Sequence, residues 1–276
     1  MDALDHKWHR LKKVLQQYPD LLVAYSGGVD STLLLKVAVD VLKHRALGVL
    51  GRSPSLPKAE LESALAVARR FQLPVVVIDT HELEDAQYRS NPHNRCYFCK
   101  KELFSRMLAY ARKHAFTHLA DGTHADDVGD DRPGRTAAGE FRVCSPLLEA
   151  GLHKQDIREL SRRLGLPTWN KPEMACLASR FPTGTPISPK ALQQVEASEA
   201  FLRKLGFRQV RVRHHGQLAR IEVDEPEMAR LLHPEMRRHV DAGLKQRGYR
   251  YVTVDLRGYR RGGAARWVVK QVAYED

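Results

Sequence analysis

Along the chain up to Trp169, short apolar runs alternate with segments in which apolar residues recur at helical spacing. The apolar runs predict strands at 21–25, 46–51, 74–79 and 117–122. The helical spacing predicts helices at 1–18, 32–44, 58–71 and 155–165. Strands that alternate with such helices are typical of βαβ units. We therefore expect an α/β fold whose parallel sheet is covered by helices on both faces.

The pattern changes after Trp169. Residues 181–190 hold three prolines and a glycine, so this segment predicts a linker. The residues beyond it predict two strands, a helical stretch with an internal proline and a third strand, at 208–214, 217–223, 225–248 and 249–256. This ββαβ order indicates a small α+β domain. We place the boundary after Cys176, with a larger domain at 1–176 and a smaller one at 177–276.

The chain is basic, and its charge is uneven. Lys and Arg number 45 against 33 Asp and Glu, which gives a net charge of +12 over 276 residues. From Leu177 onward, 19 basic residues stand against 11 acidic ones, so +8 of the total lies in the smaller domain. A basic domain suggests an anionic partner, either nucleic acid or a phosphate-bearing small molecule. A solvated surface that happens to be basic explains the charge equally well.

The remaining composition narrows the class of protein. No apolar run approaches the roughly 18 residues of a membrane span, and the start lacks the apolar stretch of a signal peptide. Four cysteines do not make a disulfide scaffold. We expect a cytoplasmic homo-oligomer with no membrane partner.

A glycine-containing turn, residues 26–31 (SGGVDS), lies between the first predicted strand and the helix after it. Gly27 and Gly28 let backbone N–H groups approach an anion, and the helix start adds its positive dipole end. Ser26 and Ser31 supply hydroxyl donors to phosphate. Asp30 suits a Mg²⁺ ion that bridges phosphate oxygens.

This turn is neither a Walker loop, which needs a lysine after its glycines, nor the G-x-G-x-x-G dinucleotide turn. It resembles the loop of the PP-loop pyrophosphatases, which cleave ATP between the α- and β-phosphates. A capped strand-to-helix turn without a ligand is the plainer interpretation.

A second polar cluster follows the fourth predicted strand. The carboxyl ends of parallel strands meet at the edge of the sheet where ligands bind. We predict that Gly122, Asp126 and Asp127 bind the nucleotide or its Mg²⁺. Capping of a helix explains either aspartate alone nearly as well.

Three of the four cysteines lie in polar motifs. Cys96 and Cys99 form a C-x-x-C beside basic residues, a setting that favours thiolates, and Cys176 precedes the predicted linker. A zinc ribbon needs a second C-x-x-C, and a thioredoxin-like pair follows the first strand of its fold. Three thiolates that hold an iron–sulfur cluster with one iron left open are the third option. Cys144 stands alone in an apolar stretch and is predicted to be inert.

Ordered blocks over nearly the whole chain resemble the LarE family of ATP-dependent sulfur transferases. They are AYSGGVDSTLLL, NPHNRCYFCKKELF, DGTHADDVGDDRPG, CSPLLEAGLHKQDIR, ACLASRFPTGTPIS and RVRHHGQLARIEV. The resemblance implies a PP-loop domain that uses ATP and Mg²⁺ to adenylylate a carboxylate of a pyridinium-3,5-dicarboxylate mononucleotide. Pyrophosphate leaves, and a sulfur nucleophile then displaces AMP to give a thiocarboxylate for the nickel-pincer cofactor of lactate racemase. His124 departs from the pattern, in which we expect Asn.

The resemblance also implies how sulfur is delivered. Cys176 stands where the family's sulfur-delivering cysteine lies, and in some members that cysteine gives up its own sulfur and ends as dehydroalanine. Members with an additional C-x-x-C hold a 4Fe–4S cluster that passes on an extra sulfide. With Cys96, Cys99 and Cys176, this sequence resembles the cluster-bearing type, which takes sulfide or another sulfur donor as a partner.

Further residues gain roles from their places in these blocks. Ser179 and Arg180 are predicted to bind the reacting carboxylate or acyl phosphate. Glu199 and Glu222 resemble the family's acids near the active site, although a surface salt bridge explains each of them equally well.

Two arginines on one strand suit the phosphate of the substrate. Arg211 and Arg213 are two residues apart and therefore project from the same face. Paired guanidiniums bind phosphate well. Surface salt bridges explain these arginines equally well.

Two other functions use part of the same pattern. A tRNA thiolase also pairs this glycine turn with three cysteines, but flanking zinc motifs are missing and the smaller domain is small for gripping a folded RNA. An amidotransferase-type ligase such as NAD synthetase does not account for the C-x-x-C and Cys176. We therefore expect no nucleic-acid partner.

Overall fold

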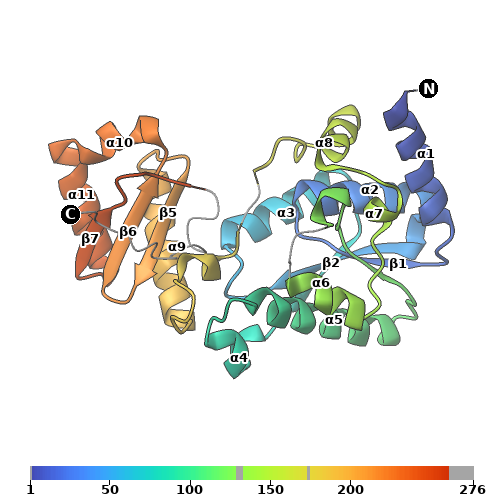
Figure 1. Cartoon of the computed structure of the whole chain (residues 1–276), viewed down its shortest axis with the longest axis horizontal. Helices are drawn as coiled ribbons and strands as arrows, with labels where there is room; N and C mark the ends of the chain where they lie inside the picture. The colour runs from blue at the N-terminus through green and yellow to red at the C-terminus, as the bar shows by residue number, and fades with distance from the viewer. Residues whose placement is uncertain (1, 129–132, 173–174, 261–276) are drawn as a thin grey trace, which may run out of the picture. The chain divides into compact units, whose positions relative to one another are not determined.

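The computed structural model describes residues 2–128, 133–172 and 175–260, and the chain divides into two compact units (Figure 1). The first unit comprises Met1–Tyr88 and Asn94–Ala175, and the second comprises Arg89–His93 and Cys176–Asp276. The sequence interpretation placed Cys176 at the end of the first domain, whereas the structure places it at the start of the second unit. The chain therefore passes between the units three times.

The first unit is built on a four-stranded parallel sheet with the strand order β3-β2-β1-β4. The strands are β1 (Leu21–Ala24), β2 (Ala46–Arg52), β3 (Val75–Asp79) and β4 (Leu119–Ala120). In β1, Leu21 and Val23 belong to one apolar cluster, while Leu22 and Ala24 belong to another. Because neighbouring side chains of a strand point to opposite faces, the sheet is buried on both faces, as the sequence predicts.

Helices cover this sheet. They are α1 (Ala3–Gln16), α2 (Val29–Leu42), α3 (Lys58–Arg70), α4 (Ala86–Arg89), α5 (Arg95–Lys113), α6 (Pro133–Glu140), α7 (Pro146–Glu149) and α8 (Lys154–Arg163). The four predicted helices are present as α1, α2, α3 and α8. Among the residues that the structure describes, no helix is both long and apolar enough to span a bilayer.

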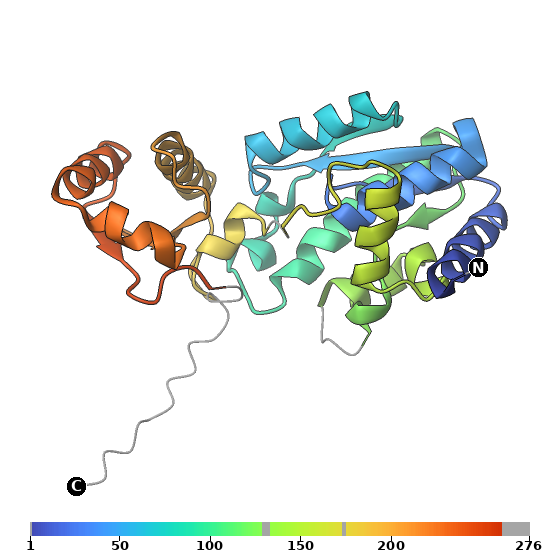
Figure 2. The same cartoon turned by 90° about the horizontal axis from the view of Figure 1, so that it is seen from above.

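The second unit, which runs from yellow-orange to red in Figure 2, contains a three-stranded sheet. In this sheet, β5 and β6 are antiparallel and β6 and β7 are parallel. Its elements are α9 (Pro189–Lys204), β5 (Val210–His215), β6 (Leu218–Val223), α10 (Glu225–Leu232), α11 (Pro234–Gln246) and β7 (Tyr251–Val254). The helical stretch breaks before Pro234, because proline cannot donate the hydrogen bond that would continue the helix. The predicted ββαβ order is present, with α9 added before it.

The proline-rich segment does not join the two units, so the linker prediction is wrong. It lies wholly within the second unit, and Phe181 and Ile187 are each only 2% exposed. Hydrogen bonds from Gly184 and Ile187 tie it to residues 89–91. Its prolines and glycine therefore shape a packed turn rather than a solvated connection.

Candidate active site

The glycine-containing turn joins β1 to α2, as the sequence predicts. Gly27 has φ +69°, and a Cβ atom there would lie 2.4 Å from the Cβ of Ala64. Only glycine fits this close approach of the turn to α3. Gly28 is the N-cap of α2, so the first N–H groups of a 14-residue helix point out of the turn.

Two serines of the turn hold each other in place. The Oγ atoms of Ser26 and Ser31 lie 3.0 Å apart, and the backbone N–H groups of Ser26 and Gly28 donate to the Ser31 and Ser26 hydroxyls at 3.1 and 3.3 Å. The turn therefore presents hydroxyl groups and a helix N-terminus together, which is the arrangement that binds phosphate.

A hollow of about 340 Å³ lies at the carboxyl ends of β1 and β4. Its lining consists of Ala24, Tyr25, Ser26, Asp30, Ser31, Lys100, Leu103, Asp121, Gly122, Thr123, His124, Asp127 and Lys154. Of the residues predicted to bind nucleotide, the lining includes Ser26, Asp30, Ser31, Gly122 and Asp127. Its size and position fit a bound nucleotide.

Two lysines in this lining were not predicted from the sequence. The Nζ of Lys154 donates to both carboxylate oxygens of Asp30, at 2.8 and 2.7 Å. The Nζ of Lys100 lies 3.7 Å from Oδ2 of Asp121. These pairings connect residues that are far apart in the chain, so no local pattern reveals them. Both lysines bring positive charge to a site that suits phosphate.

His124 occupies the position where the family pattern predicts Asn. Its side chain is 8% exposed, and its Nε2 lies 3.9 Å from an Asp30 oxygen and 3.6 Å from an Asp127 oxygen. The imidazole thus connects the glycine turn to the second polar cluster. The ring is also part of the lining of the hollow.

Asp126 is not among the residues that line the hollow. Its carboxylate contacts Nδ1 of His153 at 2.6 Å and accepts from the backbone N–H of Lys154 at 2.7 Å. The hydrogen bond with His153 is the main reason that the pKa of Asp126 lies below its ordinary value. Asp126 fixes the start of α8 and so helps to place Lys154.

The donor chemistry of the hollow fits Mg²⁺. This ion binds through one or two carboxylates together with the phosphates of a nucleotide, and Asp30 presents a carboxylate beside the turn. With Mg²⁺ and phosphate present, Lys154 has a second anion to bind in place of Asp30. Asp30 is therefore the residue that would hold the ion.

The C-x-x-C lies in the first turns of α5. Cys96 is exposed and Cys99 is partly buried. Cys176 is also partly buried, and it is the N-cap residue of the short helix η4 (Leu177–Arg180) in the second unit. Within the described residues, no three His, Cys, Asp or Glu side chains form a group able to hold a metal ion.

Cys144 has a different setting from the other three cysteines. It is partly buried, and burial is the largest cause of the raised pKa of its thiol. A raised pKa keeps the sulfur protonated and poorly reactive. This agrees with the sequence interpretation of Cys144 as inert.

In the second unit, Arg180 and Glu199 form a fully buried ion pair. Their side chains are 0% and 1% exposed, and Nε and Nη2 of Arg180 donate to the two Glu199 oxygens at 2.8 and 3.0 Å. Burial opposes ionisation of Glu199, but the hydrogen bonds and charge of Arg180 outweigh it and keep this pKa below its ordinary value. Nη1 of Arg180 donates to the Cys176 carbonyl and to the Ser179 hydroxyl, each at 3.0 Å. The pair therefore fixes the backbone that carries Cys176.

A second buried pair joins β5 to β6. Nε and Nη2 of Arg213 donate to Glu222 at 2.9 and 2.7 Å, and Nη1 of Arg213 donates to the Ser179 carbonyl at 2.9 Å. Arg220 also contacts Glu222, at 3.1 Å. Three predicted site residues, Ser179, Arg213 and Glu222, are thus linked directly, and they form buried contacts rather than the alternative surface salt bridges.

Arg211 differs from Arg213 because it has no such carboxylate. Its side chain is 5% exposed, its guanidinium lies over the ring of Tyr259 at 5.1 Å, and its Nη1 donates to the Val210 carbonyl. In the part of the chain that the structure describes, no Asp or Glu lies within ion-pair distance of it. Burial, and next the positive charge of Arg180, lower the pKa of Arg211. A buried cation of this kind is stabilised by an anion.

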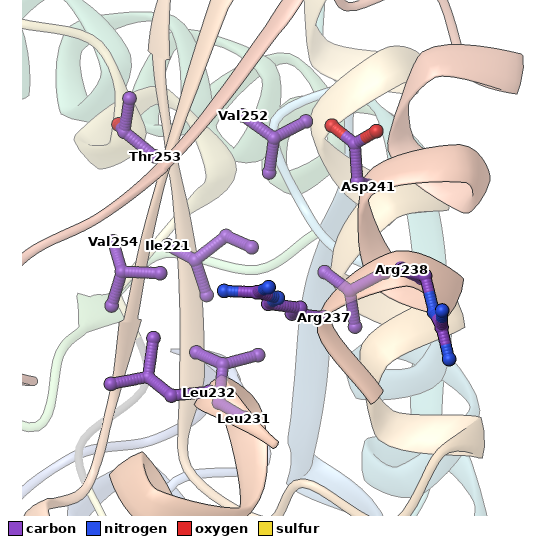
Figure 3. A pocket seen from close by; sticks show the side chains of 10 residues that line it. Ile221, Leu231, Leu232, Arg237, Arg238, Asp241, Val252, Thr253 and Val254 are labelled. Atoms are coloured by element: carbon purple, nitrogen blue, oxygen red, sulfur yellow. The ribbon is translucent and has the colours of Figure 1, made fainter. Parts of the chain in front are cut away.

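A second hollow, of about 360 Å³, lies in the second unit between β6, β7, α10 and α11 (Figure 3). Its lining consists of Ile221, Leu231, Leu232, Arg237, Arg238, Val240, Asp241, Val252, Thr253 and Val254. None of the predicted site residues belongs to this lining, so the candidate active site does not use it.

Comparison with known proteins agrees with the geometry. The family model described as NAD synthase matches residues 6–127, which include the glycine turn and the second polar cluster. The chain is 36% identical to the pyridinium-3,5-bisthiocarboxylic acid mononucleotide synthase of Lactiplantibacillus plantarum, over 95% of both chains. Uncharacterised proteins of Synechocystis sp. and Methanocaldococcus jannaschii are 40% and 30% identical, over 97% and 87% of this chain and 100% and 90% of their own.

The parallel sheet, the glycine turn and the hollow define a PP-loop enzyme that uses ATP. The 36% identity to the bisthiocarboxylic acid mononucleotide synthase, over 95% of both chains, narrows the class from PP-loop enzymes in general to one family. The protein belongs to the LarE family of ATP-dependent sulfurtransferases.

Proposed function

We propose that this protein converts the carboxylates of a pyridinium-3,5-dicarboxylate mononucleotide to thiocarboxylates, the chemistry that supplies the nickel-pincer cofactor of lactate racemase. The observation that carries the proposal is the 36% identity to the bisthiocarboxylic acid mononucleotide synthase over 95% of both chains. The buried cation of Arg211 supports it, because the substrate brings a phosphate.

The first step is adenylylation. A carboxylate oxygen of the substrate attacks the α-phosphorus of ATP, the bond from the α-phosphorus to the bridging oxygen breaks, and pyrophosphate leaves. The turn at 26–31 and the start of α2 bind the phosphates, and Asp30 would hold a Mg²⁺ ion that offsets their charge. Lys100 and Lys154 neutralise the pyrophosphate as it forms. Gly122, Asp126 and Asp127 position the nucleotide, with Asp126 acting through Lys154.

The second step is sulfur transfer. A sulfur nucleophile attacks the activated carbonyl carbon, and the carbon–oxygen bond to AMP breaks. We assign Ser179 and Arg180 to the reacting acyl phosphate, and Arg211 and Arg213 to the phosphate of the substrate. Glu199 and Glu222 hold the arginines in place by the buried pairs described above.

We assign Cys96, Cys99 and Cys176 as the ligands of a 4Fe–4S cluster. Three cysteine thiols suit the donor chemistry of such a cluster, and the start of a helix favours thiolates at the C-x-x-C. When bound, the cluster supplies sulfide for transfer, so Cys176 keeps its own sulfur.

Product analysis tests the adenylylation step. Incubation with MgATP and the dicarboxylate mononucleotide should yield AMP and pyrophosphate. Formation of ADP and phosphate would contradict α–β cleavage. A salt-dependent gel shift with bulk tRNA tests the tRNA thiolase alternative, and we expect no specific shift. Cytoplasmic location and homo-oligomerisation remain proposals, which fractionation and light scattering test.

Anaerobic reconstitution tests the cluster. Protein treated with iron and sulfide should bind both, and Cys96→Ala or Cys99→Ala should lose the iron. Cys144→Ala, the matched control, should keep it. Sulfur transfer with loss of H₂S from Cys176 in reconstituted protein would show that the cysteine itself is consumed.

A further inference from the structure

A lysine outside the candidate active site contacts the backbone of the glycine-containing turn. The Nζ of Lys171 donates to the carbonyl of Gly27 at 3.2 Å. The same Nζ lies 2.9 Å from Oε2 of Glu60 in α3, and both side chains are only 18% exposed. Lys171 is not among the described residues that line the hollow beside the turn, so its contact differs from those of Lys100 and Lys154.

The segment that carries Lys171 is itself held in place by α8. Nη1 and Nη2 of Arg158 donate to the carbonyls of Trp169 and Lys171, at 2.7 and 3.3 Å. The backbone N–H of Lys171 donates to the carbonyl of Thr168 at 3.0 Å. The Lys171 ammonium therefore reaches the turn from a fixed backbone rather than from a free loop.

Helix α3 supports the same contact from its other side. Glu60 and Ala64 are four residues apart and therefore lie on one face of this helix. Ala64 is the residue that Gly27 approaches so closely that a side chain would not fit. The ion pair with Glu60 thus places the Lys171 ammonium at the carbonyl of that same glycine, and all of these residues belong to the first unit.

The contact with Lys171 fixes the direction of a backbone N–H group. A trans peptide is planar, so the carbonyl of Gly27 and the N–H of Gly28 point in opposite directions. The carbonyl faces Lys171, whereas the N–H donates at 3.3 Å to the hydroxyl of Ser26, which lines the hollow. Two consecutive glycines rotate easily, and a rotated peptide would turn its carbonyl toward the phosphates and repel them. A cation bound to the carbonyl opposes that rotation.

We propose that Lys171 is a positioning residue for ATP, which keeps the peptide between Gly27 and Gly28 turned so that its N–H faces the phosphates. The inference rests on the proposed function only in assigning the phosphates to this turn, and it does not depend on how sulfur is delivered. Lys171 acts through the backbone of the turn and touches no phosphate in this role.

Hydrogen exchange of the protein without nucleotide tests the positioning directly. Lys171→Met removes the charge and keeps an unbranched side chain. In this variant, the peptide over residues 24–32 should exchange several-fold faster than in the wild type, as mass spectrometry would show. Lys171→Arg, which keeps a cation with several donors, should recover most of the protection.

Lys36→Met is the matched control for these variants. The Lys36 side chain is 23% exposed, close to the 18% of Lys171, and it forms an ion pair with Asp40 further along α2. Its loss removes a comparable ion pair from the helix that follows the turn. The peptide over residues 24–32 should therefore exchange in Lys36→Met as it does in the wild type.

A double variant separates positioning from the loss of an ion pair. Lys171→Met leaves the partly buried carboxylate of Glu60 without its lysine, and this alone lowers the stability of the unit. Lys171→Met combined with Glu60→Gln leaves no such charge. The faster exchange should persist in the double variant, whereas Glu60→Gln alone, which keeps the donor to Gly27, should show much less of it.

Binding of inorganic pyrophosphate with Mg²⁺ measures the consequence for the phosphates. Calorimetric titration should give a several-fold larger dissociation constant for Lys171→Met and for the double variant than for the wild type, with Lys171→Arg close to the wild type. A purely structural role would lower the unfolding midpoint without this pattern.

Two results would overturn the proposal. One is exchange at the wild-type rate in Lys171→Met. The other is faster exchange with unchanged affinity for pyrophosphate and MgATP, which would also show that the phosphates do not bind at this turn. A failure of the sulfur chemistry would leave both readouts as expected, so the two kinds of failure are distinguishable.

Discussion

The ammonium group of Lys154, the first residue of α8, holds both carboxylate oxygens of Asp30 in the first turn of α2, at 2.8 and 2.7 Å. Both side chains line the hollow beside the glycine turn, and they are 22% and 25% exposed. The pair neutralises a carboxylate that would otherwise repel the phosphates of ATP. Under the proposed function, the pair would separate when Asp30 binds Mg²⁺ and Lys154 binds the phosphates.

Lys154→Ala should therefore weaken MgATP binding. Loss of one cation that contacts phosphate should raise the dissociation constant about tenfold, which corresponds to about 1.4 kcal/mol. Calorimetric titration measures this. The control is Lys36→Ala, which removes an ion pair with Asp40 elsewhere on α2 and should leave the affinity unchanged. Equal affinity of Lys154→Ala and wild type would show that the lysine serves only the fold.

Arg211→Ala should weaken binding of the pyridinium mononucleotide and leave ATP binding unchanged. The buried guanidinium of Arg211 has no carboxylate partner among the described residues. Its whole positive charge therefore remains to stabilise a bound phosphate. Arg213→Ala should weaken substrate binding too, but it should also destabilise the second unit because Glu222 loses its main partner. Fluorescence titrations with each ligand separate these effects. Equal loss of both ligands would mean that Arg211 supports the fold.

Glu199→Gln should destabilise the second unit. Removing one partner of a buried ion pair typically costs about 3–5 kcal/mol, because the other charge remains buried. Urea unfolding monitored by circular dichroism measures the change. Glu159→Gln, which alters a partly exposed partner of Arg162 and Arg163, is the control and should change the stability little. A small effect at Glu199 would show that water or another group replaces the carboxylate.

The same pair predicts a dependence on pH. The pKa of folded Glu199 lies below its ordinary value of 4.5, so the unfolded chain binds the proton more readily. The contribution of Glu199 to stability is therefore complete above pH 4.5 and is lost as the pH falls through the folded pKa. Unfolding midpoints from pH 7 down to acid should drop less steeply in Glu199→Gln than in the wild type. Parallel curves would contradict this.

Local patterns predicted the parts of the fold and site that are continuous in sequence. The apolar run at 21–25 predicted β1, and the two glycines after it predicted the turn. Both features depend only on residues that are neighbours in the sequence. The pairing of Lys154 with Asp30 could not be predicted, since its members are 124 residues apart. The hydrogen bond from Nδ2 of Asn91 to the Pro182 carbonyl could not be predicted either, since these residues are 91 positions apart. Proline content suggested a linker at 181–190, whereas long-range hydrogen bonds make that segment part of the second unit.

The central claim is that ATP-dependent activation ends in transfer of sulfur to the pyridinium carboxylates. The most direct test is mass spectrometry of the mononucleotide after anaerobic incubation of iron-reconstituted protein with MgATP and isotopically labelled sulfide. The account predicts that labelled sulfur replaces one oxygen of each carboxylate, in more equivalents than there is enzyme. AMP formation with no sulfur in the mononucleotide would contradict it.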